Sequence, residues 1–242
     1  MEKRQQLREG KAKILFETDQ PDRFLIQYFK DDATAFNALK KANIDGKGVV
    51  NNTVSTWIFK HLAKHGIPTH FVEKLSDREM LVKRVDIIPV EVVIRNRATG
   101  SILKRLGLEK GAAFKTPLVE FFYKSDSLGD PLIGETHILH FGWATPEQIQ
   151  TITRLSFQVN EILKKVFDQA GLELIDFKLE FGKECGTDKV VLADEFSPDG
   201  CRLWDKVTGE SKDKDRFRQD LGGVQEAYLE VQKRLAPILE NK

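Results

Sequence analysis

The chain has 242 residues, of which 40% are hydrophobic and 31% charged, and its formal net charge is +1. This composition is typical of a globular protein and excludes a largely disordered chain. The near-zero charge gives no overall field that would favour binding to nucleic acid or to an acidic membrane. The length suffices for one large domain, or for two small domains that share a cleft.

The cysteines and the first residues of the sequence indicate the cellular compartment of the protein. Cys185 and Cys201 form neither a CxxC pair nor a disulfide framework. The first residues, MEKRQQLREGK, lack the apolar stretch of a secretion signal, and no apolar run approaches membrane-spanning length. We therefore expect a cytoplasmic protein that binds neither membranes nor nucleic acid.

The first third of the sequence predicts strands around one helix. Apolar, β-rich segments predict strands within 12–18, 23–32, 68–76 and 80–89. The helix is indicated by apolar residues at helical spacing, and Gly66 and Pro68 end it. Its apolar residues are Val50, Val54, Trp57, Ile58 and Leu62.

The remainder alternates strands and helices. We expect strands at 90–96, 118–124, 172–182 and 189–200, a short helix at 101–107 and a last helix at about 224–239. A long helix begins at Thr145, because a threonine cap, a proline at the first helical position and Gln148 form a capping box. Its apolar stripe is Ile149, Ile152, Val159, Ile162, Leu163 and Val166, and Gly171 ends it.

These elements predict an α+β fold with two lobes. We expect a β-rich lobe over residues 1–88, an α+β lobe over residues 89–242, and a cleft between them.

The segment LELIDFKLEFG alternates apolar and charged residues. In a strand, Asp176, Lys178 and Glu180 share one face, and apolar side chains take the other. One interpretation is a solvated face with a salt bridge, and the other is a functional site. If the following hairpin is centred near Thr187, Glu180 lies opposite Asp194, and a bridging Mg²⁺ would remove the repulsion between the carboxylates. In another register the two carboxylates never meet.

Several segments supply donors for phosphate. Lys11 and Lys13 follow Gly10 at the start of a strand. In IRNRATGS, a buried strand ends near Arg95, and a helix opens at Ser101, which is favourable for an anion. Each motif also has an ordinary surface interpretation. Further charged groups lie in turns or near helix ends: Lys124, Asp126, Asp130, Arg202, Arg216 and Arg218.

Common catalytic motifs are absent from the sequence. It has no GxxxxGK[ST] loop, no GxGxxG loop, no zinc-ligand spacing and no GxSxG motif. No residue therefore stands out as a covalent nucleophile.

Six motifs occur together in one order. They are GKAK, GKGVVNN, VEVVIRNRATGS, DFKLEFG, DEFSPDGCRLWD and DKDRFRQDLGG. Through them, essentially the whole chain resembles the SAICAR synthetases of purine biosynthesis. The resemblance implies a two-lobe ATP-binding fold distantly like that of protein kinases. It also implies ligation of L-aspartate to carboxyaminoimidazole ribonucleotide (CAIR) with ATP and Mg²⁺, by a protein that is a homodimer.

The resemblance also implies residue roles. Lys11, Lys13 and Lys124 would approach the ATP phosphates, Val82 and Lys83 would line the adenine site, and Glu180 and Asp194 would bind Mg²⁺. The ribonucleotide site would contain Arg95, Ser101 and Arg202, with Asp176, Lys178 and Arg218 around the reacting groups. Asp176, Lys178 and Lys124 would form the catalytic set, and Asp176 is a candidate general base on proximity alone. Many relatives have aspartate where this chain has Asn37, so a role that needs a carboxylate there is in doubt.

Two other functions remain open from the sequence. A small-molecule kinase on a related fold would release a phosphorylated product rather than an amide. A non-catalytic nucleotide-binding regulator would have no need of the metal carboxylates Glu180 and Asp194, so their presence argues against it.

Overall fold

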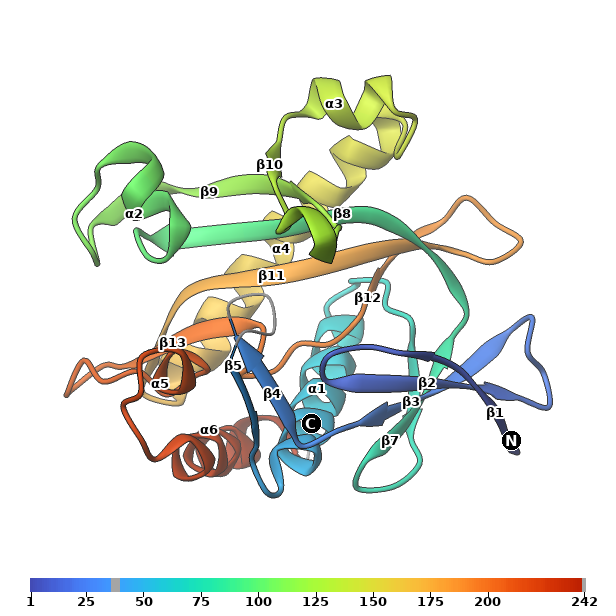
Figure 1. Ribbon diagram of the computed structural model, residues 1–242, viewed down its shortest axis with the longest axis horizontal. Coiled ribbons are helices and arrows are strands. Elements are labelled where there is room, and N and C mark those ends of the chain that lie inside the picture. Colours follow the sequence, from blue (N-terminus) through green and yellow to red (C-terminus); the bar gives the residue numbers. More distant parts are fainter. Residues whose placement is uncertain (36–39, 241–242) are drawn as a thin grey trace.

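The computed structural model describes residues 1–35 and 40–240 (Figure 1). Its first sheet is antiparallel with the strand order β1-β2-β3-β7-β6. The strands are β1 (Lys3–Glu9), β2 (Lys13–Thr18), β3 (Phe24–Phe29), β6 (Phe71–Lys74) and β7 (Glu79–Lys83). A separate hairpin consists of β4 (Asp32–Ala35) and β5 (Lys40–Asn43).

The second sheet is built around one long strand, β11. Strand β8 pairs with one edge of β11, and β12 and β13 pair with successive parts of the other edge. Beyond β8 the order continues to β9 and β10. The bounds are β8 (Val85–Arg97), β9 (Ala113–Tyr123), β10 (Leu132–Ile133), β11 (Leu172–Glu184), β12 (Val190–Ala193) and β13 (Cys201–Asp205).

Helices cover the sheets and join them. Helix α4 packs against β8, β11 and β12, and α6 packs against α1 and α4 (Figure 1). The helices are α1 (Lys47–Lys64), α2 (Ser101–Leu106), α3 (Glu135–His140), α4 (Pro146–Gln169), α5 (Asp215–Arg218) and α6 (Val224–Leu239), with a 3-10 turn η1 (Asp126–Leu128).

The structure confirms the α+β class and most of the expected elements. Helix α4 begins with the expected capping box, because the Gln148 amide donates to Thr145 Oγ1 and the Thr145 amide donates to Gln148 Oε1. Gly171, just beyond the helix, has a φ of 70°. Strand β1 was not expected, since all of its residues are exposed and show no apolar alternation.

One hydrophobic core runs through both sheets. Phe29 of the first sheet, Ile58 of α1 and Phe181 of β11 belong to the same buried cluster. The division into lobes at residue 88 therefore stays a proposal. Within the described ranges, no helix combines the length and the hydropathy that crossing a membrane would require.

Candidate active site

The two carboxylates on the charged face of β11 are buried, and Lys178 between them is partly exposed. Asp176 and Glu180 are each only 3% exposed. The opposite face carries Ile175, Phe177, Leu179 and Phe181, all within the core. A charge without water must be paired, because its desolvation costs several kcal/mol. The solvated-face interpretation is thus wrong, and each charged residue of β11 has to be accounted for by its partners.

Around Lys178 lies a lysine–carboxylate cluster, made of Lys13, Lys124, Lys178, Glu91, Glu180 and Asp194. Lys178 Nζ lies 2.5 Å from Glu180 Oε1, 2.9 Å from Glu91 Oε1 and 3.6 Å from Asp194 Oδ2. Lys124 Nζ lies 2.6 Å from the same Glu180 oxygen, and Lys13 donates to Asp194 Oδ1. Strands β2, β8 and β11 and the segments after β9 and β12 therefore converge on one point.

Asp194, Glu180 and Lys178 are held in their ionised forms by one another and by the lysines around them. Burial raises the pKa of Asp194, but Lys13 and Lys178 outweigh burial and hold it below the ordinary value. Burial and Asp194 raise the pKa of Glu180, while Lys178 and Lys124 lower it to below the ordinary value. Burial lowers the pKa of Lys178, yet Glu180, Asp194 and Glu91 raise it well above the ordinary value. The cluster consequently offers both charged donors and anionic oxygens at neutral pH.

The predicted hairpin register is wrong by one residue. Glu180 lies opposite Ala193, not opposite Asp194. The turn is centred between Gly186 and Thr187, and Gly186 has a φ of 78° that suits a tight turn. Asp194 still reaches the cluster, because it lies just beyond β12 with a φ of 63°. This left-handed backbone is uncommon for a residue other than glycine, and here it directs the Asp194 side chain into the cluster.

First-sheet and α1 side chains hold the segment that carries Asp194. Gln27 Nε2 donates to the Asp194 carbonyl over 3.3 Å, and Ser55 Oγ donates to the Phe196 carbonyl over 3.0 Å. Further along, Lys47 Nζ lies 2.6 Å from Asp199 Oδ2. The left-handed conformation of Asp194 is thus fixed by contacts from distant parts of the sequence.

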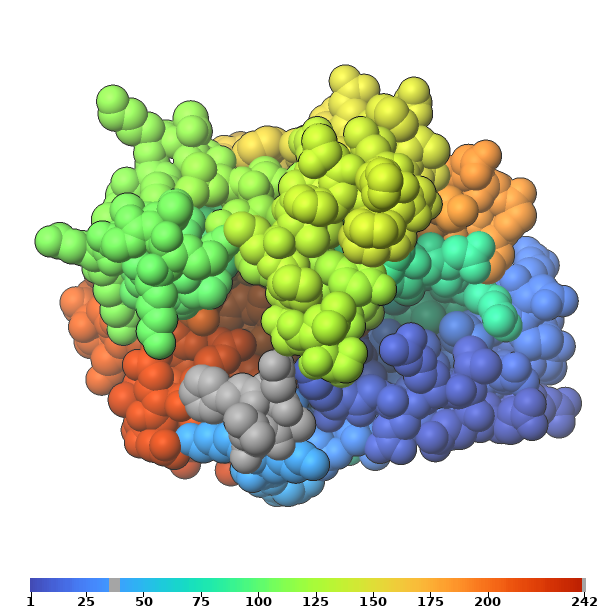
Figure 2. Space-filling model, turned by 45° about the horizontal axis from the view of Figure 1, so that its top comes forward, coloured from blue at the N-terminus to red at the C-terminus, as the bar shows by residue number. Residues whose placement is uncertain are grey.

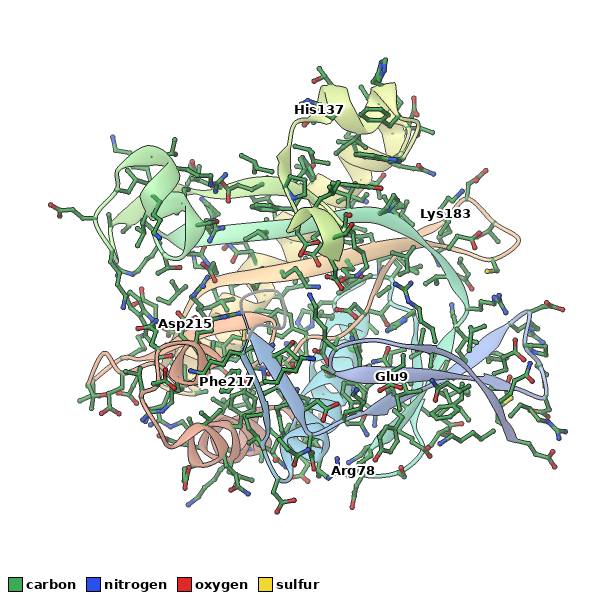
Figure 3. The ribbon with its side chains drawn as sticks, in the orientation of Figure 1. Glu9, Arg78, His137, Lys183, Asp215 and Phe217 are labelled. Carbon is green, nitrogen blue, oxygen red and sulfur yellow. The ribbon has the colours of Figure 1, made fainter. Side chains whose placement is uncertain are left out.

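An arginine cluster lies at the other end of the β11 charged face. It consists of Arg95, Arg202, Arg218, Asp176, Asp215 and Glu120. Asp176 accepts hydrogen bonds from Arg95 at 2.9 Å, Arg202 at 2.9 Å and Thr99 Oγ1 at 2.5 Å. Asp215 opens α5 beside β13 (Figure 3) and lies between Arg202 at 2.8 Å and Arg218 at 2.6 Å.

The turn before α2 brings Ser101 to this cluster. Arg95 Nη2 lies 3.4 Å from Ser101 Oγ. Gly100 has a φ of 64°, and a Cβ atom there would lie 2.9 Å from Arg202 Nη2. Glycine is therefore needed both for the backbone conformation and for the close approach of the guanidinium. The strand, glycine and helix of IRNRATGS are arranged as expected, and they place guanidinium groups beside an exposed hydroxyl.

The other candidate residues are not members of these clusters. Lys11 pairs with Asp126 at 2.7 Å, and Lys83 pairs with Glu184 at 3.0 Å. Val82 lies in β7 with its side chain in the core. Asn37 lies outside the described residues.

Sequence reasoning missed Glu91, Lys47 and Asp199. Glu91 lies directly opposite Glu180 across the β8–β11 ladder, and Lys178 bridges the two carboxylates. Its signal was an acid inside the otherwise apolar VEVVI strand. Lys47 lies in GKGVVNN and Asp199 in DEFSPDG, and only the fold reveals that they are partners.

The carboxylates of the cluster fit Mg²⁺ in the way that nucleotide-binding sites use it. Over residues 1–35 and 40–240, no group of three His, Cys, Asp or Glu side chains is placed to hold a metal unaided. Mg²⁺ is commonly bound through one or two carboxylates together with substrate phosphates. The ionised oxygens of Glu180 and Asp194 match that donor set.

Comparison of the sequence with known proteins gives a consistent result. The family model described as SAICAR synthetase matches residues 6–235. The chain is 56% identical to the phosphoribosylaminoimidazole-succinocarboxamide synthase of Novosphingobium aromaticivorans, over all of this chain and 92% of that protein. It is 58% identical to the synthase of the same name from a Thermoanaerobacter species, over 97% of this chain and 99% of that protein.

Solved structures agree with the sequence comparison. The synthase of that name from Ehrlichia chaffeensis matches with a TM-score of 0.94 and 49% identity, covering 96% of this chain and 98% of that chain. A SAICAR synthetase in complex with ADP matches with a TM-score of 0.92 and 46% identity, covering 95% and 97%. With the family model spanning most of the chain and these relatives covering nearly all of it, the protein belongs to the SAICAR synthetase family.

Proposed function

We propose that this protein joins L-aspartate to the carboxylate of CAIR, with ATP as the phosphoryl donor, and releases SAICAR, ADP and phosphate. Its membership of the SAICAR synthetase family carries this proposal. The site supports it, because a buried strand connects a lysine–carboxylate cluster suited to a triphosphate with an arginine cluster suited to a nucleotide monophosphate.

The lysine–carboxylate cluster is our candidate for the ATP site. Lys13 and Lys124, with Lys11 in the turn before β2, would donate to the ATP phosphates, and the stretch at Val82 and Lys83 would lie along the adenine. Glu180 and Asp194 would hold Mg²⁺, which supplies neutralisation of the phosphate charge when it is bound. A SAICAR synthetase of similar structure has been solved with ADP.

The arginine cluster is our candidate for the ribonucleotide site. Arg95 and Arg202, held by buried carboxylates, would present their remaining donors with Ser101 to the ribonucleotide phosphate. Arg218 at the end of α5 would bind a neighbouring polar group of CAIR or aspartate. Binding energy from this remote phosphate would orient the reacting carboxylate.

The reaction would take place in two steps. A carboxylate oxygen of CAIR attacks the γ-phosphorus of ATP, and the bond to ADP breaks, which gives an acyl phosphate. The amine of aspartate then attacks the acyl carbon, and phosphate leaves. Lys178 belongs to the lysine–carboxylate cluster, follows Asp176 by two residues on the same face of β11, and would balance negative charge at the reacting groups. Positioning and charge neutralisation would supply most of the rate enhancement.

Asp176 fits a structural role at the site better than that of general base. Both of its oxygens accept hydrogen bonds from Arg202, and Oδ2 also accepts from Arg95 and Thr99. These donors already occupy both carboxylate oxygens, so the carboxylate faces its own partners rather than a substrate. We therefore assign Asp176 to holding the two arginines in place.

We also propose a cytoplasmic homodimer. The free cysteines Cys185 and Cys201 are compatible with a reducing compartment. Exposed apolar side chains on β10, α3 and the residue after α3 would suit a contact between copies: Leu132, Leu139 and Phe141. Analytical ultracentrifugation tests the dimer, and a sedimentation coefficient of a 27.6 kDa monomer at micromolar concentration would contradict it.

The direct test of function is to incubate the protein with ATP, Mg²⁺, CAIR and L-aspartate and to identify SAICAR by mass spectrometry. Reactions that lack one substrate are the controls. Formation of SAICAR with stoichiometric ADP supports the ligase. Phosphorylation of CAIR that persists as the final product when aspartate is present would support the kinase alternative instead.

A further inference from the structure

The turn that follows β9 carries a lysine and an aspartate that contact different parts of the molecule. Two internal hydrogen bonds close the turn: the Ser125 amide donates to Asp130 Oδ1, and the Asp130 amide donates to the Ser125 carbonyl. Lys124, at its base, donates to Glu180 in the lysine–carboxylate cluster. Asp126, at the start of η1, is largely exposed and points to another partner.

That partner is Lys11, in the turn between β1 and β2. The Gly10 amide donates to the Lys13 carbonyl over 2.8 Å, so the turn is tight and Lys11 lies at its tip. Lys11 Nζ lies 2.7 Å from Asp126 Oδ1, across 115 positions of sequence. The pair therefore joins the first sheet to the second. In Figure 2 the yellow-green segment after β9 reaches the blue amino-terminal segment.

The pair lies close to the lysine–carboxylate cluster. The hydrogen bond from Lys11 is the largest influence that lowers the pKa of Asp126, and the charges of Lys124 and Lys178 lower it further. Lys11 lies in the turn two residues before Lys13, the first residue of β2, and Lys13 contacts Asp194. An anion that bound at the cluster would meet Lys11 and the negative charge of Asp126 together.

We propose that Asp126 is a positioning residue that acts through Lys11 and sets the affinity for ATP. It holds the Lys11 ammonium across the mouth of the site when no nucleotide is bound, and it competes with the triphosphate for that ammonium. The inference rests on the proposed function, because it takes the cluster to be the ATP site. It assigns Asp126 a role that opposes binding, whereas Lys124 in the same turn favours binding.

A double-mutant cycle on nucleotide affinity tests the proposal. Binding of ATP with Mg²⁺, in the absence of CAIR, is measured by calorimetry for wild type, Asp126→Asn, Lys11→Met and the double variant. Asp126→Asn should tighten ATP binding by about two- to fivefold, the range expected from an exposed ion pair. The tightening should vanish when Lys11→Met is already present. In steady state, the KM for ATP should fall while the KM for CAIR stays unchanged.

Glu161→Gln is the matched control, because it removes the same charge from the exposed surface of α4. It should leave ATP affinity unchanged. Unchanged or weaker ATP binding in Asp126→Asn, or equal tightening with and without Lys11, would overturn the proposal. Wild-type formation of SAICAR would then still support the ligase, so the two failures are distinguishable.

Discussion

Lys47 and Asp199 form an ion pair with Nζ and Oδ2 2.6 Å apart, and the Lys47 side chain has no solvent exposure. The other Asp199 oxygen accepts a hydrogen bond from the Tyr228 hydroxyl at 2.6 Å. Burial raises the pKa of Asp199, but Lys214 and Lys47 outweigh burial and hold it below the ordinary value. Lys47 of α1 and Tyr228 of α6 thus both bind Asp199, and they hold the segment between Asp194 and Arg202 in place. This segment joins the two charged clusters of the site.

Lys47→Met should therefore destabilise the fold. The substitution keeps most of the side-chain volume but leaves a buried carboxylate without its ammonium partner, which typically costs about 3–5 kcal/mol. Urea unfolding followed by circular dichroism measures the loss. Lys47→Met combined with Asp199→Asn should recover part of it, because the buried carboxylate is removed together with its ion-pair partner. A single variant as stable as wild type would mean that the pair contributes little.

Asp194→Asn should lower both stability and turnover. Relief of carboxylate repulsion alone would predict a stabilised variant, but Lys13 and Lys178 already offset that repulsion. Loss of the carboxylate leaves Lys13 without its nearest partner, at a cost of roughly 1–3 kcal/mol. Asparagine tolerates the left-handed backbone, so the chain path should be kept. Turnover should fall on the order of a hundredfold or more, as when one preorganised electrostatic partner is removed.

A Mg²⁺ titration of turnover separates these effects, with Glu180→Gln as the second variant. Both variants should need more Mg²⁺ than wild type for half-maximal activity. If both show wild-type turnover and wild-type Mg²⁺ dependence, the cluster is not the metal site.

Stability should fall in acid in a way that depends on Asp194. Its folded-state pKa lies below the ordinary value of 3.8. A depressed carboxylate pKa contributes stability that is present above the ordinary pKa and is lost as the pH falls through the folded-state pKa. The free energy of unfolding of wild type should thus decline below about pH 4. The difference between wild type and Asp194→Asn should shrink over the same range, and urea titrations at pH 5 and pH 3 measure it. A constant difference would contradict the assigned ionisation.

Arg95→Ala should weaken CAIR far more than ATP. Loss of a charge-assisted phosphate contact typically costs about 1.5–3 kcal/mol. The variant should also be less stable, because Asp176 and Glu120 each lose a partner. Substrate KM values are therefore compared below the unfolding temperature, with Arg97→Ala as the control on the same strand. A large effect on ATP with CAIR unaffected would reverse the assignment of the two sites.

If the reaction passes through an acyl phosphate, one carboxylate oxygen of CAIR must leave with the phosphate. With CAIR whose carboxylate oxygens carry ¹⁸O, one labelled oxygen should appear in the released phosphate. Mass spectrometry of the phosphate detects it. Unlabelled phosphate, with both labels kept elsewhere, would rule out attack by the CAIR carboxylate on ATP.

Local sequence signals predicted the elements whose causes are local. The capping box at Thr145 located the start of α4, and the alternation of 172–182 identified β11 with the correct side chains on each face. In both cases the stabilising contacts lie within a few residues or follow from strand geometry.

Features that depend on distant partners were not predictable. Strand β1 forms through its backbone hydrogen bonds to β2. Its side chains are polar and exposed, so its sequence shows no alternation of apolar and polar residues. The hairpin register differed by one residue because turn geometry, rather than charge pairing, sets it. Asp194 reaches the cluster through a left-handed backbone held by Gln27, which no pattern around either residue reveals.

Strand β11 also fixes the separation between the two charged clusters. Asp176 belongs to the arginine cluster and Glu180 to the lysine–carboxylate cluster, and they are four residues apart on one face. At the rise of a β-strand this separation is about 13 Å. The strand therefore sets the distance between the proposed site for the CAIR phosphate and the proposed site for ATP. Insertion of one residue between the two positions would turn Glu180 into the core, so the spacing of the two clusters can be changed only in steps of two residues.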